Sequence, residues 1–332
     1  MNLRFAIIGC GSIANQHAKQ IMRLGKLVSV CDIESEKAKS MADNFNCLLF
    51  YSLDDLLNNS PDFDILVVCT PNGLHVEHTI KALKKQKHVL CEKPLCFKPE
   101  EAILMKQIAL EANRKIWVVK QNRFNPPVLA VKKMLNENQL GQIHSFQINC
   151  FWNRPDSYYK DSWRGTQSLD GGVLYTQFSH FIDLLYWFLG DVKKIVGMTR
   201  NYQHQSTEIE DCGHIIFEME NNATGTMNYN INTYNKNMEG SFTIFGEKGT
   251  VKIGGEYLNL LSYHSVENQE SLKIDKSNHP NEYESYQGSM NNHHLVYEQL
   301  VEGFATDNID LAGVDDGMKT AEIISLIYSK AN

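Results

Sequence analysis

The stretch that most constrains the fold lies within the first dozen residues. A short apolar run of strand character ends at Gly9, and Gly11 and Ala14 then lead into a segment that can become helical from Ser12. A strand, a glycine-rich turn and a helix start in this order let backbone amides approach a pyrophosphate. The helix N-terminus adds free amides and a partial positive charge. Ala14 replaces a third glycine, which the fingerprint tolerates because only a small residue is needed there.

Strand and helix patterns alternate through the first 120 residues. The expected strands are Phe5–Ile8, Leu27–Cys31, Cys47–Tyr51, Asp64–Cys69, His88–Cys91 and Ile116–Val119. The fourth of these is almost wholly apolar, as expected for a strand buried on both faces of a parallel sheet. The pattern predicts an α/β fold whose first domain, residues 1–121, is a Rossmann domain with a doubly wound parallel sheet.

The pattern changes near Gln121, where strand-like stretches recur with few helical ones. The expected strands are His144–Trp152, Val192–Tyr202, Cys212–Met219, Gly225–Thr233, Gly240–Phe245 and Thr250–Ile253. One strong helix is expected at Leu174–Leu189, a polar surface loop or arm at Val266–Met290, and a C-terminal helix at 316–329 that can pack back on the first domain. This predicts an α+β second domain, residues 122–332, with a large, mainly antiparallel open sheet, for substrate binding and oligomerisation.

Composition excludes several classes of partner. No apolar run approaches the ~20 residues that a membrane span needs, and no signal peptide is visible. A net charge of -7 without a basic block argues against nucleic acid. The eight cysteines form no CxxC pair, so we expect small buried thiols in a reducing compartment. We expect a soluble cytoplasmic protein without a metal site.

Asp32 lies 21 residues after Gly11, at the end of the second predicted strand. A carboxylate there can accept hydrogen bonds from the adenosine ribose hydroxyls and would repel a 2′-phosphate. No Arg or Lys follows immediately, so NAD is favoured over NADP. Two alternatives to an NAD site remain. Asp32 could be a solvated loop acid, or the same residues could belong to a methyltransferase that binds S-adenosylmethionine.

Two further turns follow predicted strands of the same sheet. Thr70-Pro-Asn-Gly-Leu-His75 follows one strand, and Glu92-Lys93-Pro94 follows the next. Residues just past the strand ends of a doubly wound sheet line its ligand crevice. A lysine held there by a proline turn would stand over the reactive end of the cofactor, whereas a surface lysine is the alternative.

A histidine lies in the middle of the predicted helix of the second domain. Thr176, His180 and Asp183 fall at i, i+4 and i+7, with Gln177 alongside, and apolar residues cover the rest of the helix. A polar stripe on a buried helix must face partners or a ligand cleft. We therefore expect His180 to be catalytic, with a structural core histidine as the alternative.

These motifs, in this order and over the whole chain, resemble the glucose–fructose oxidoreductase and inositol dehydrogenase (Gfo/Idh/MocA) superfamily. Within it, Val119–Pro127, Tyr158–Thr166 and Leu169–Gly172 are similar to bacterial UDP-N-acetylglucosaminuronate 3-dehydrogenases of lipopolysaccharide sugar biosynthesis. The resemblance implies an NAD-dependent sugar dehydrogenase that oxidises the 3-hydroxyl of a UDP-sugar, with UDP-N-acetyl-glucosaminuronic acid favoured.

The resemblance also implies residue roles. Lys93 would orient the hydroxyl and stabilise an alkoxide-like transition state, His180 would take or relay the proton, and Asp183 would orient the imidazole. The expected cofactor contacts are Gly9, Gly11, Ser12, Ile13, Asp32, Thr70, Pro71, Asn72, His75, Glu92, Lys93, Gln121, Trp163 and Arg164. The expected substrate contacts are Lys93, Arg123, Tyr159, Lys160, Arg164, Thr176, Gln177 and His180. Thr176 departs from the aspartate of many relatives, which puts an Asp–His relay in doubt.

Other readings stay open at this point. The chain could be a dehydrogenase of a free sugar or of inositol, or a protein that senses a dinucleotide without catalysis. Which of Lys93 and His180 accepts the proton is also open. Because an open sheet with one exposed face usually needs covering, and relatives commonly bury it between subunits, we expect a homo-oligomer, a dimer or a tetramer.

Overall fold

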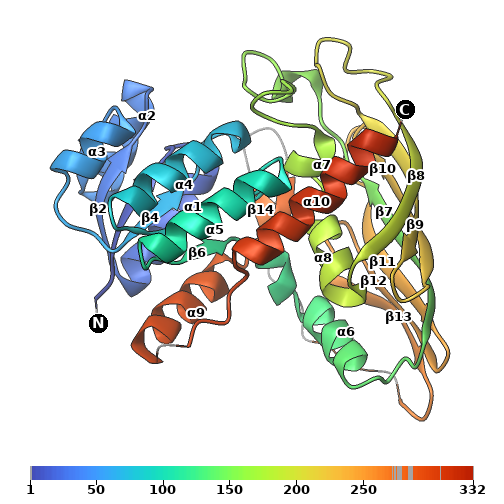
Figure 1. Cartoon of the computed structure of the whole chain (residues 1–332). Helices are drawn as coiled ribbons and strands as arrows, with labels where there is room; N and C mark the ends of the chain where they lie inside the picture. Colours follow the sequence, from blue (N-terminus) through green and yellow to red (C-terminus); the bar gives the residue numbers. More distant parts are fainter. Residues whose placement is uncertain are drawn as a thin grey trace. The chain divides into compact units, whose positions relative to one another are not determined.

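The structure is a computed structural model (Figure 1). It describes residues 2–270, 272, 274, 279–282, 287–306 and 308–331. The chain forms two compact units. The first unit comprises Met1–Val119 and His293–Ala321, and the second comprises Lys120–Asn292 and Glu322–Asn332.

The first unit is built on a six-stranded parallel sheet with the order β3-β2-β1-β4-β5-β6. Its strands are β1 (Arg4–Ile8), β2 (Lys26–Cys31), β3 (Leu48–Phe50), β4 (Ile65–Val68), β5 (His88–Cys91) and β6 (Ile116–Val118). The strand order reverses between β1 and β4, and ligands of doubly wound sheets bind at such a switch point. The predicted Rossmann fold is confirmed.

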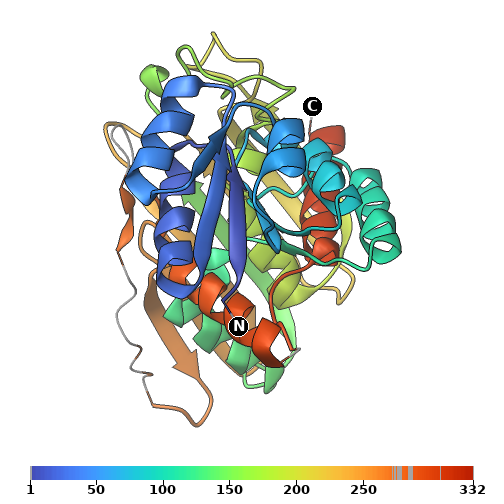
Figure 2. The same ribbon diagram turned by 90° about the vertical axis from the view of Figure 1, so that its left-hand side faces the viewer.

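Helices cover both faces of this sheet, as Figure 2 shows with blue helices on one side and cyan helices on the other. They are α1 (Ser12–Leu24), α2 (Ser35–Phe45), α3 (Leu53–Asn59), α4 (His75–Lys84) and α5 (Pro99–Glu111). All four residues of β4 are buried, which explains its continuous apolar run. Helix α9 (His293–Thr306), from the C-terminal part of the chain, packs beside α1. The sequence pattern had not predicted α9.

The second unit is built on a seven-stranded sheet with the order β13-β12-β11-β7-β10-β9-β8. Its strands are β7 (Ile143–Phe151), β8 (Val192–Arg200), β9 (Cys212–Met219), β10 (Thr224–Asn230), β11 (Glu239–Gly246), β12 (Gly249–Gly254) and β13 (Leu260–Val266). All neighbouring pairs are antiparallel except β10 and β7. The predicted mainly antiparallel sheet is therefore confirmed, with β13 as an added edge strand.

In the part of the chain that the structure describes, helices cover only one face of the second sheet. Figure 1 shows α6 (Pro126–Asn136), α7 (Val173–Thr176), α8 (Ser179–Leu189) and the last turns of α10 (Val314–Lys330) on that face. Phe146 and Phe242 stack there with ring centroids 6.0 Å apart, and Phe178, between α7 and α8, and Phe181, on α8, are fully buried. The other face leaves large apolar side chains exposed, among them Val196, Met198, Ile216, Leu260 and Tyr263.

One prediction about a single element was wrong, and another is only partly covered by the described residues. The helix expected at Leu174–Leu189 is two helices, α7 and α8, which are interrupted at Gln177 and Phe178. Thr176 therefore ends one helix, while His180 and Asp183 share the next. The arm expected at Val266–Met290 lies partly outside the described residues, and its described part includes a strand pair, β14 (Pro280–Glu282) with β15 (Gln287–Met290).

None of the described helices is long and apolar enough to span a membrane.

Candidate active site

The glycine turn after β1 is shaped for close approach of another backbone. Gly9 has φ +86°, and a Cβ there would lie 2.6 Å from the carbonyl of Cys69, so only glycine is tolerated. At Gly11 a Cβ would meet no described atom within 4 Å, so this side of the turn is open. No described side chain caps the N-terminus of α1, which leaves its first amides available for a phosphate.

Asp32 stands directly after β2 and is held by the backbone. Its Oδ2 accepts a hydrogen bond from Cys10 N at 2.7 Å, and its Oδ1 accepts one from Glu34 N at 2.8 Å. The remaining lone pairs of this oriented carboxylate can accept hydrogen bonds from ribose hydroxyls. Glu34 and Glu36 follow closely, so the local charge disfavours a 2′-phosphate. The glycine turn and Asp32 together fit NAD.

His75 connects the two turns that follow β4 and β5. Its Nε2 lies 2.8 Å from the carbonyl oxygen of Thr70, and its Nδ1 lies 2.6 Å from that of Pro94. Burial lowers the pKa of His75, so the ring is neutral near pH 7. Asn72, in the short 3-10 helix Asn72–Leu74 within the first of these turns, is buried as well. The structure thus joins the Thr70–His75 turn to the turn that carries Lys93.

Glu92 and Lys93 follow directly after β5, at the same edge of the sheet. The Lys93–Pro94 peptide bond is cis. The Glu92 carboxylate is buried, and its Oε1 lies 2.9 Å from His17 Nε2 and 3.3 Å from His293 Nε2. Its Oε2 accepts a hydrogen bond from Lys93 N at 3.1 Å. Both carboxylate oxygens of Glu92 therefore accept hydrogen bonds from protein groups. Its predicted contact with the cofactor stays a prediction.

In the second unit, His180 lies on α8, and its Nε2 faces one side-chain amide and one hydroxyl group. Gln121 Nε2 is 3.3 Å and Ser289 Oγ is 3.4 Å from that nitrogen. Gln121 Nε2 also donates to Ser289 Oγ at 3.0 Å, so the serine hydroxyl can direct its proton at the ring. When Nε2 accepts these hydrogen bonds, the imidazole is neutral, which is the form that a general base needs. Sequence reasoning missed Ser289, which lies in the polar span before α9.

Asp183, one turn after His180, pairs with two cations. Its carboxylate lies 2.8 Å from Arg123 Nη2 and 2.9 Å from Arg123 Nε, and 3.1 Å from Lys120 Nζ. Burial alone would raise the pKa of Asp183, but Lys120 and Arg123 outweigh it and lower the pKa to about 2. Sequence reasoning missed Lys120, although a lysine two residues after the buried strand β6 was a usable signal.

The loop between β7 and α7 supplies further candidate side chains. The Arg164 guanidinium stacks 4.6 Å from the Tyr158 ring and 5.2 Å from the Trp163 ring. Tyr159 is buried, whereas Lys160 is exposed. Thr176 donates from its hydroxyl to the carboxylate of Asp170. A carboxylate is therefore present beside Thr176, although position 176 itself has none.

Among the buried polar atoms of the second unit that have no hydrogen-bond partner in the described residues, three belong to predicted site residues. They are Tyr159 Oη, Gln177 Oε1 and Gln121 Oε1. Buried polar groups are nearly always hydrogen-bonded, so each of these atoms is a candidate for contact with a bound molecule. All three were predicted site residues.

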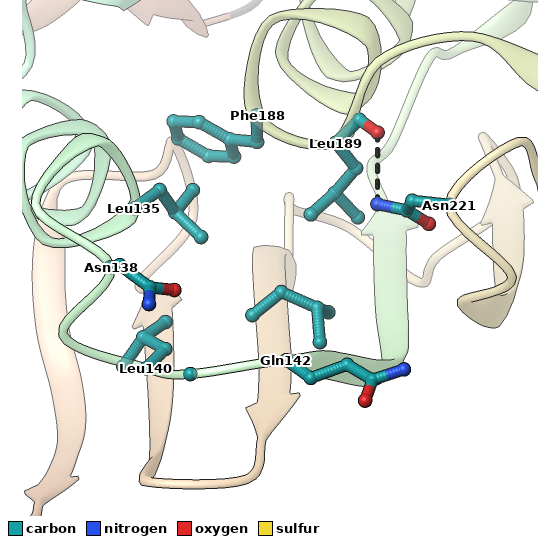
Figure 3. Close-up of a pocket in the computed structure, with 9 residues that line it drawn as sticks. Leu135, Asn138, Leu140, Gln142, Phe188, Leu189 and Asn221 are labelled. Carbon is teal, nitrogen blue, oxygen red and sulfur yellow. Dashed lines mark hydrogen bonds between the residues drawn. The ribbon is translucent and has the colours of Figure 1, made fainter.

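A pocket elsewhere in the second unit is lined by other residues (Figure 3). It has a volume of about 280 Å³ and is lined by Leu135, Asn138, Leu140, Gly141, Gln142, Ile143, Phe188, Leu189 and Asn221. Asn221 Nδ2 donates to the carbonyl oxygen of Leu189 at 3.2 Å within it. None of the predicted site residues lines this pocket, so we do not place the candidate site there.

Comparison with protein families matches both parts of the chain. The model described as the oxidoreductase family, NAD-binding Rossmann fold, matches residues 3–120. The model of the GFO/IDH/MocA C-terminal domain matches residues 128–252.

Two solved structures resemble the chain over nearly its whole length. One is the WlbA dehydrogenase from Chromobacterium violaceum in complex with NADH and UDP-GlcNAcA, with 31% identity, 99% of this chain and 94% of that chain covered, and a TM-score of 0.91. The other is the WlbA dehydrogenase from Bordetella pertussis, also with NADH and UDP-GlcNAcA, with 31% identity, 100% and 97% covered, and a TM-score of 0.89.

Among curated proteins, glucose-6-phosphate 3-dehydrogenase from Bacillus subtilis is 33% identical over 190 residues, which are 56% of this chain and 53% of that protein. The chain spans about half the length of the first curated relatives that it matches. The predicted family, oxidoreductase class and NAD cofactor are confirmed. The chain belongs to the Gfo/Idh/MocA oxidoreductase family, whose first domain is an NAD-binding Rossmann fold.

Proposed function

We propose that this protein oxidises the 3-hydroxyl of a UDP-sugar, most specifically UDP-N-acetyl-glucosaminuronic acid, to the 3-keto sugar for lipopolysaccharide biosynthesis. The observation that carries the proposal is the likeness to the two WlbA dehydrogenases, both of which were solved with NADH and UDP-GlcNAcA. At 31% identity over 99% of the chain, this likeness covers the second unit as well as the first.

The proposed chemistry uses two side chains for the proton and the developing charge. The Lys93 ammonium donates a hydrogen bond to the sugar hydroxyl and stabilises the alkoxide-like transition state. His180 accepts the hydroxyl proton at Nε2, the nitrogen that faces Ser289 and Gln121. NAD, when bound, supplies the hydride acceptor for the hydrogen that leaves the oxidised carbon. Asp183 is proposed to orient the imidazole through the α8 face that it shares with His180.

The charge of the substrate fits the side chains proposed to bind it. A diphosphate and a uronic carboxylate are anions, and Arg forks bind both. Arg164 and Lys160 are proposed for these groups, together with Tyr159, Thr176 and Gln177. Arg123, which pairs with Asp183, is proposed to bind an anionic group of the substrate together with Lys120. Trp163 is proposed to pack by the nicotinamide, and Thr70, Pro71, Asn72 and Ile13 to line the dinucleotide.

The first test is turnover of a substrate panel with NAD. The protein is incubated with UDP-N-acetyl-glucosaminuronic acid, UDP-N-acetylglucosamine, glucose 6-phosphate and myo-inositol, and both NADH absorbance and product mass are followed. We expect a product that has lost two hydrogens only with the UDP-uronic acid. The Lys93→Ala and His180→Ala proteins should bind NADH normally and lose most turnover; unchanged turnover in either removes that residue from the mechanism.

A second candidate substrate is glucose 6-phosphate. The 33% identity to the Bacillus subtilis glucose-6-phosphate 3-dehydrogenase favours it, although that match spans only 56% of this chain. A higher kcat/KM for glucose 6-phosphate than for the UDP-uronic acid would identify glucose 6-phosphate as the preferred substrate.

We further propose that the protein forms a homo-oligomer through the open face of the seven-stranded sheet, where Val196, Met198 and Ile216 are exposed. We also propose a reducing compartment, the cytoplasm, because all eight cysteines are free thiols and seven of them are buried.

A further inference from the structure

Four buried side chains of the first unit, one of which is the carboxylate that precedes Lys93, form a hydrogen-bonded cluster. They are Glu92, His17 from α1, and His293 and Tyr297 from α9, and none is more than 6% exposed. His17 Nε2 lies 2.9 Å from Glu92 Oε1, and His293 Nε2 lies 3.3 Å from the same oxygen. His17 Nδ1 lies 2.9 Å from Tyr297 Oη. We call these four residues the Glu92 cluster.

The hydrogen bonds of the cluster define its protonation. Burial lowers the pKa of His17, so its ring carries one proton near neutral pH. Placing that proton on Nε2 lets the ring donate to Glu92 while Nδ1 accepts from the Tyr297 hydroxyl. Burial would raise the pKa of Glu92, but the hydrogen bonds from His17 and His293 outweigh it and keep the pKa well below its ordinary value. Glu92 is therefore a buried anion.

This buried anion also binds the backbone of the proposed catalytic lysine. Glu92 Oε2 accepts the hydrogen bond from Lys93 N at 3.1 Å, while Oε1 receives the two histidines. An isolated buried carboxylate is costly, and its orientation is fixed by the donors around it. Removing a donor from Oε1 therefore frees the carboxylate to rotate or to take up a proton, and both changes weaken its bond to Lys93 N.

His293 is also the residue at which the chain returns to the first unit. The second segment of that unit begins at His293, which is the first residue of α9. The edge of the His293 ring packs against His17 at a centroid distance of 5.1 Å. The first side chain of the returning segment, His293, thus contacts Glu92, the residue before Lys93.

We propose that His17 and His293 are positioning residues, which hold Lys93 in its catalytic place through the Glu92 carboxylate. This inference rests on the proposed role of Lys93. A bound metal ion is the competing use of the same atoms, since His17, Glu92 and His293 offer ligand atoms within 4.8 Å of one another. The hydrogen bonds of His17 to Glu92 and Tyr297 already engage both of its ring nitrogens, which favours the positioning role.

The experiment compares removal and replacement of the histidine donors. His17→Leu and His293→Leu remove the N–H group, whereas His17→Gln and His293→Gln offer an amide N–H near the position of Nε2. His88→Leu is the matched control, because His88 also packs on α9, 5.3 Å from the Phe304 ring, but is no member of the cluster. Hydrogen exchange of the Lys93 amide, the Kd of NADH, kcat and metal content are measured for each protein.

We expect the Leu variants to exchange the Lys93 amide at least tenfold faster and to lose about tenfold in kcat, with the Kd of NADH within twofold of the wild type. The Gln variants should recover most of both losses, and His88→Leu should show neither. Unchanged exchange at Lys93 in folded Leu variants, or no recovery with Gln, overturns the positioning role.

The remaining outcomes separate this inference from the proposed function. One equivalent of a divalent metal, retained by the wild type and lost in the His293 variants, overturns positioning in favour of a metal site. If Lys93→Ala keeps its turnover, the proposed function of Lys93 fails, and with it the link to catalysis, whatever the exchange data show. If Lys93→Ala is inactive while His17→Leu and His293→Leu keep full kcat, only the positioning role fails.

Discussion

The ion cluster around Asp183 gives the most quantitative prediction. Asp183→Asn keeps the shape of the side chain but removes its charge, which leaves the buried Lys120 ammonium and the Arg123 guanidinium without an anion between them. Lys120 is only 3% exposed, so water cannot replace the lost carboxylate. Removing one partner of a buried ion pair typically costs about 3–5 kcal/mol.

The pKa of Asp183 gives a second estimate of the same quantity. It lies at about 2 instead of 3.8, and a shift of this size corresponds to roughly 2 kcal/mol, because one pKa unit equals about 1.4 kcal/mol. Because the folded-state pKa is depressed, this stabilisation is fully present above the unfolded-state pKa near 4. It is lost as the pH falls from there toward 2. The difference between wild type and Asp183→Asn should therefore be constant from pH 7 to pH 5 and shrink below pH 4.

Urea unfolding of the wild type, Asp183→Asn and Glu218→Gln at pH 7, 5, 4 and 3.5 measures both effects. Glu218 pairs with Lys193 at 2.6 Å, but both side chains are exposed, so Glu218→Gln is the matched surface control and should leave the unfolding curve unchanged. We expect Asp183→Asn to lose about 3 kcal/mol at pH 7. A loss below about 0.5 kcal/mol, within the range of ordinary surface substitutions, would refute the reasoning. So would a difference that does not shrink in acid.

Three further predictions concern the cofactor and the assembly. NADH should bind at least tenfold more tightly than NADPH, and Asp32→Ser should narrow that ratio; equal affinities of the wild type by calorimetry would remove Asp32 from the account. Gly9→Ala places a Cβ 2.6 Å from the Cys69 carbonyl at a φ of +86°, so NADH binding should fall more than tenfold, and an unchanged Kd would contradict the geometry of the turn. Ile216→Glu puts a charge on the open sheet face and should reduce the mass measured by light scattering to that of a smaller assembly, whereas an oligomer of unchanged mass would place the interface elsewhere.

The sequence predicted most of the fold because the first unit is built from local patterns. Each strand of the parallel sheet is a short apolar run bounded by turn residues, and the order of strands and helices leaves little freedom of topology. The doubly wound parallel sheet and the glycine turn followed from these patterns, whereas its strand order came from the structure. The antiparallel sheet followed from the recurrence of strand-like runs, although its edge strand β13, of which only Val266 is buried, gave too weak a pattern.

What the sequence could not give depends on contacts between distant residues. His17 and Glu92 are 75 residues apart in the sequence, and Glu92 and His293 are 201 residues apart, so no local sequence pattern predicts the Glu92 cluster. Gln121 and Ser289 are 168 residues apart, which hid the serine beside His180. The break between α7 and α8 was missed because Gln177 and Phe178 continue the helical pattern, whereas tertiary packing of Phe178 in the core determines the actual backbone.

The central claim is that hydride leaves the C3 position of a UDP-uronic acid. Its most direct test uses UDP-N-acetyl-glucosaminuronic acid deuterated at C3, with wild-type protein and NAD, and follows the isotope by mass spectrometry. We predict that the deuterium appears in the reduced cofactor and is absent from the keto sugar. A keto sugar that retains the deuterium at C3, or a substrate that stays unoxidised while another sugar of the panel is turned over, would contradict the account.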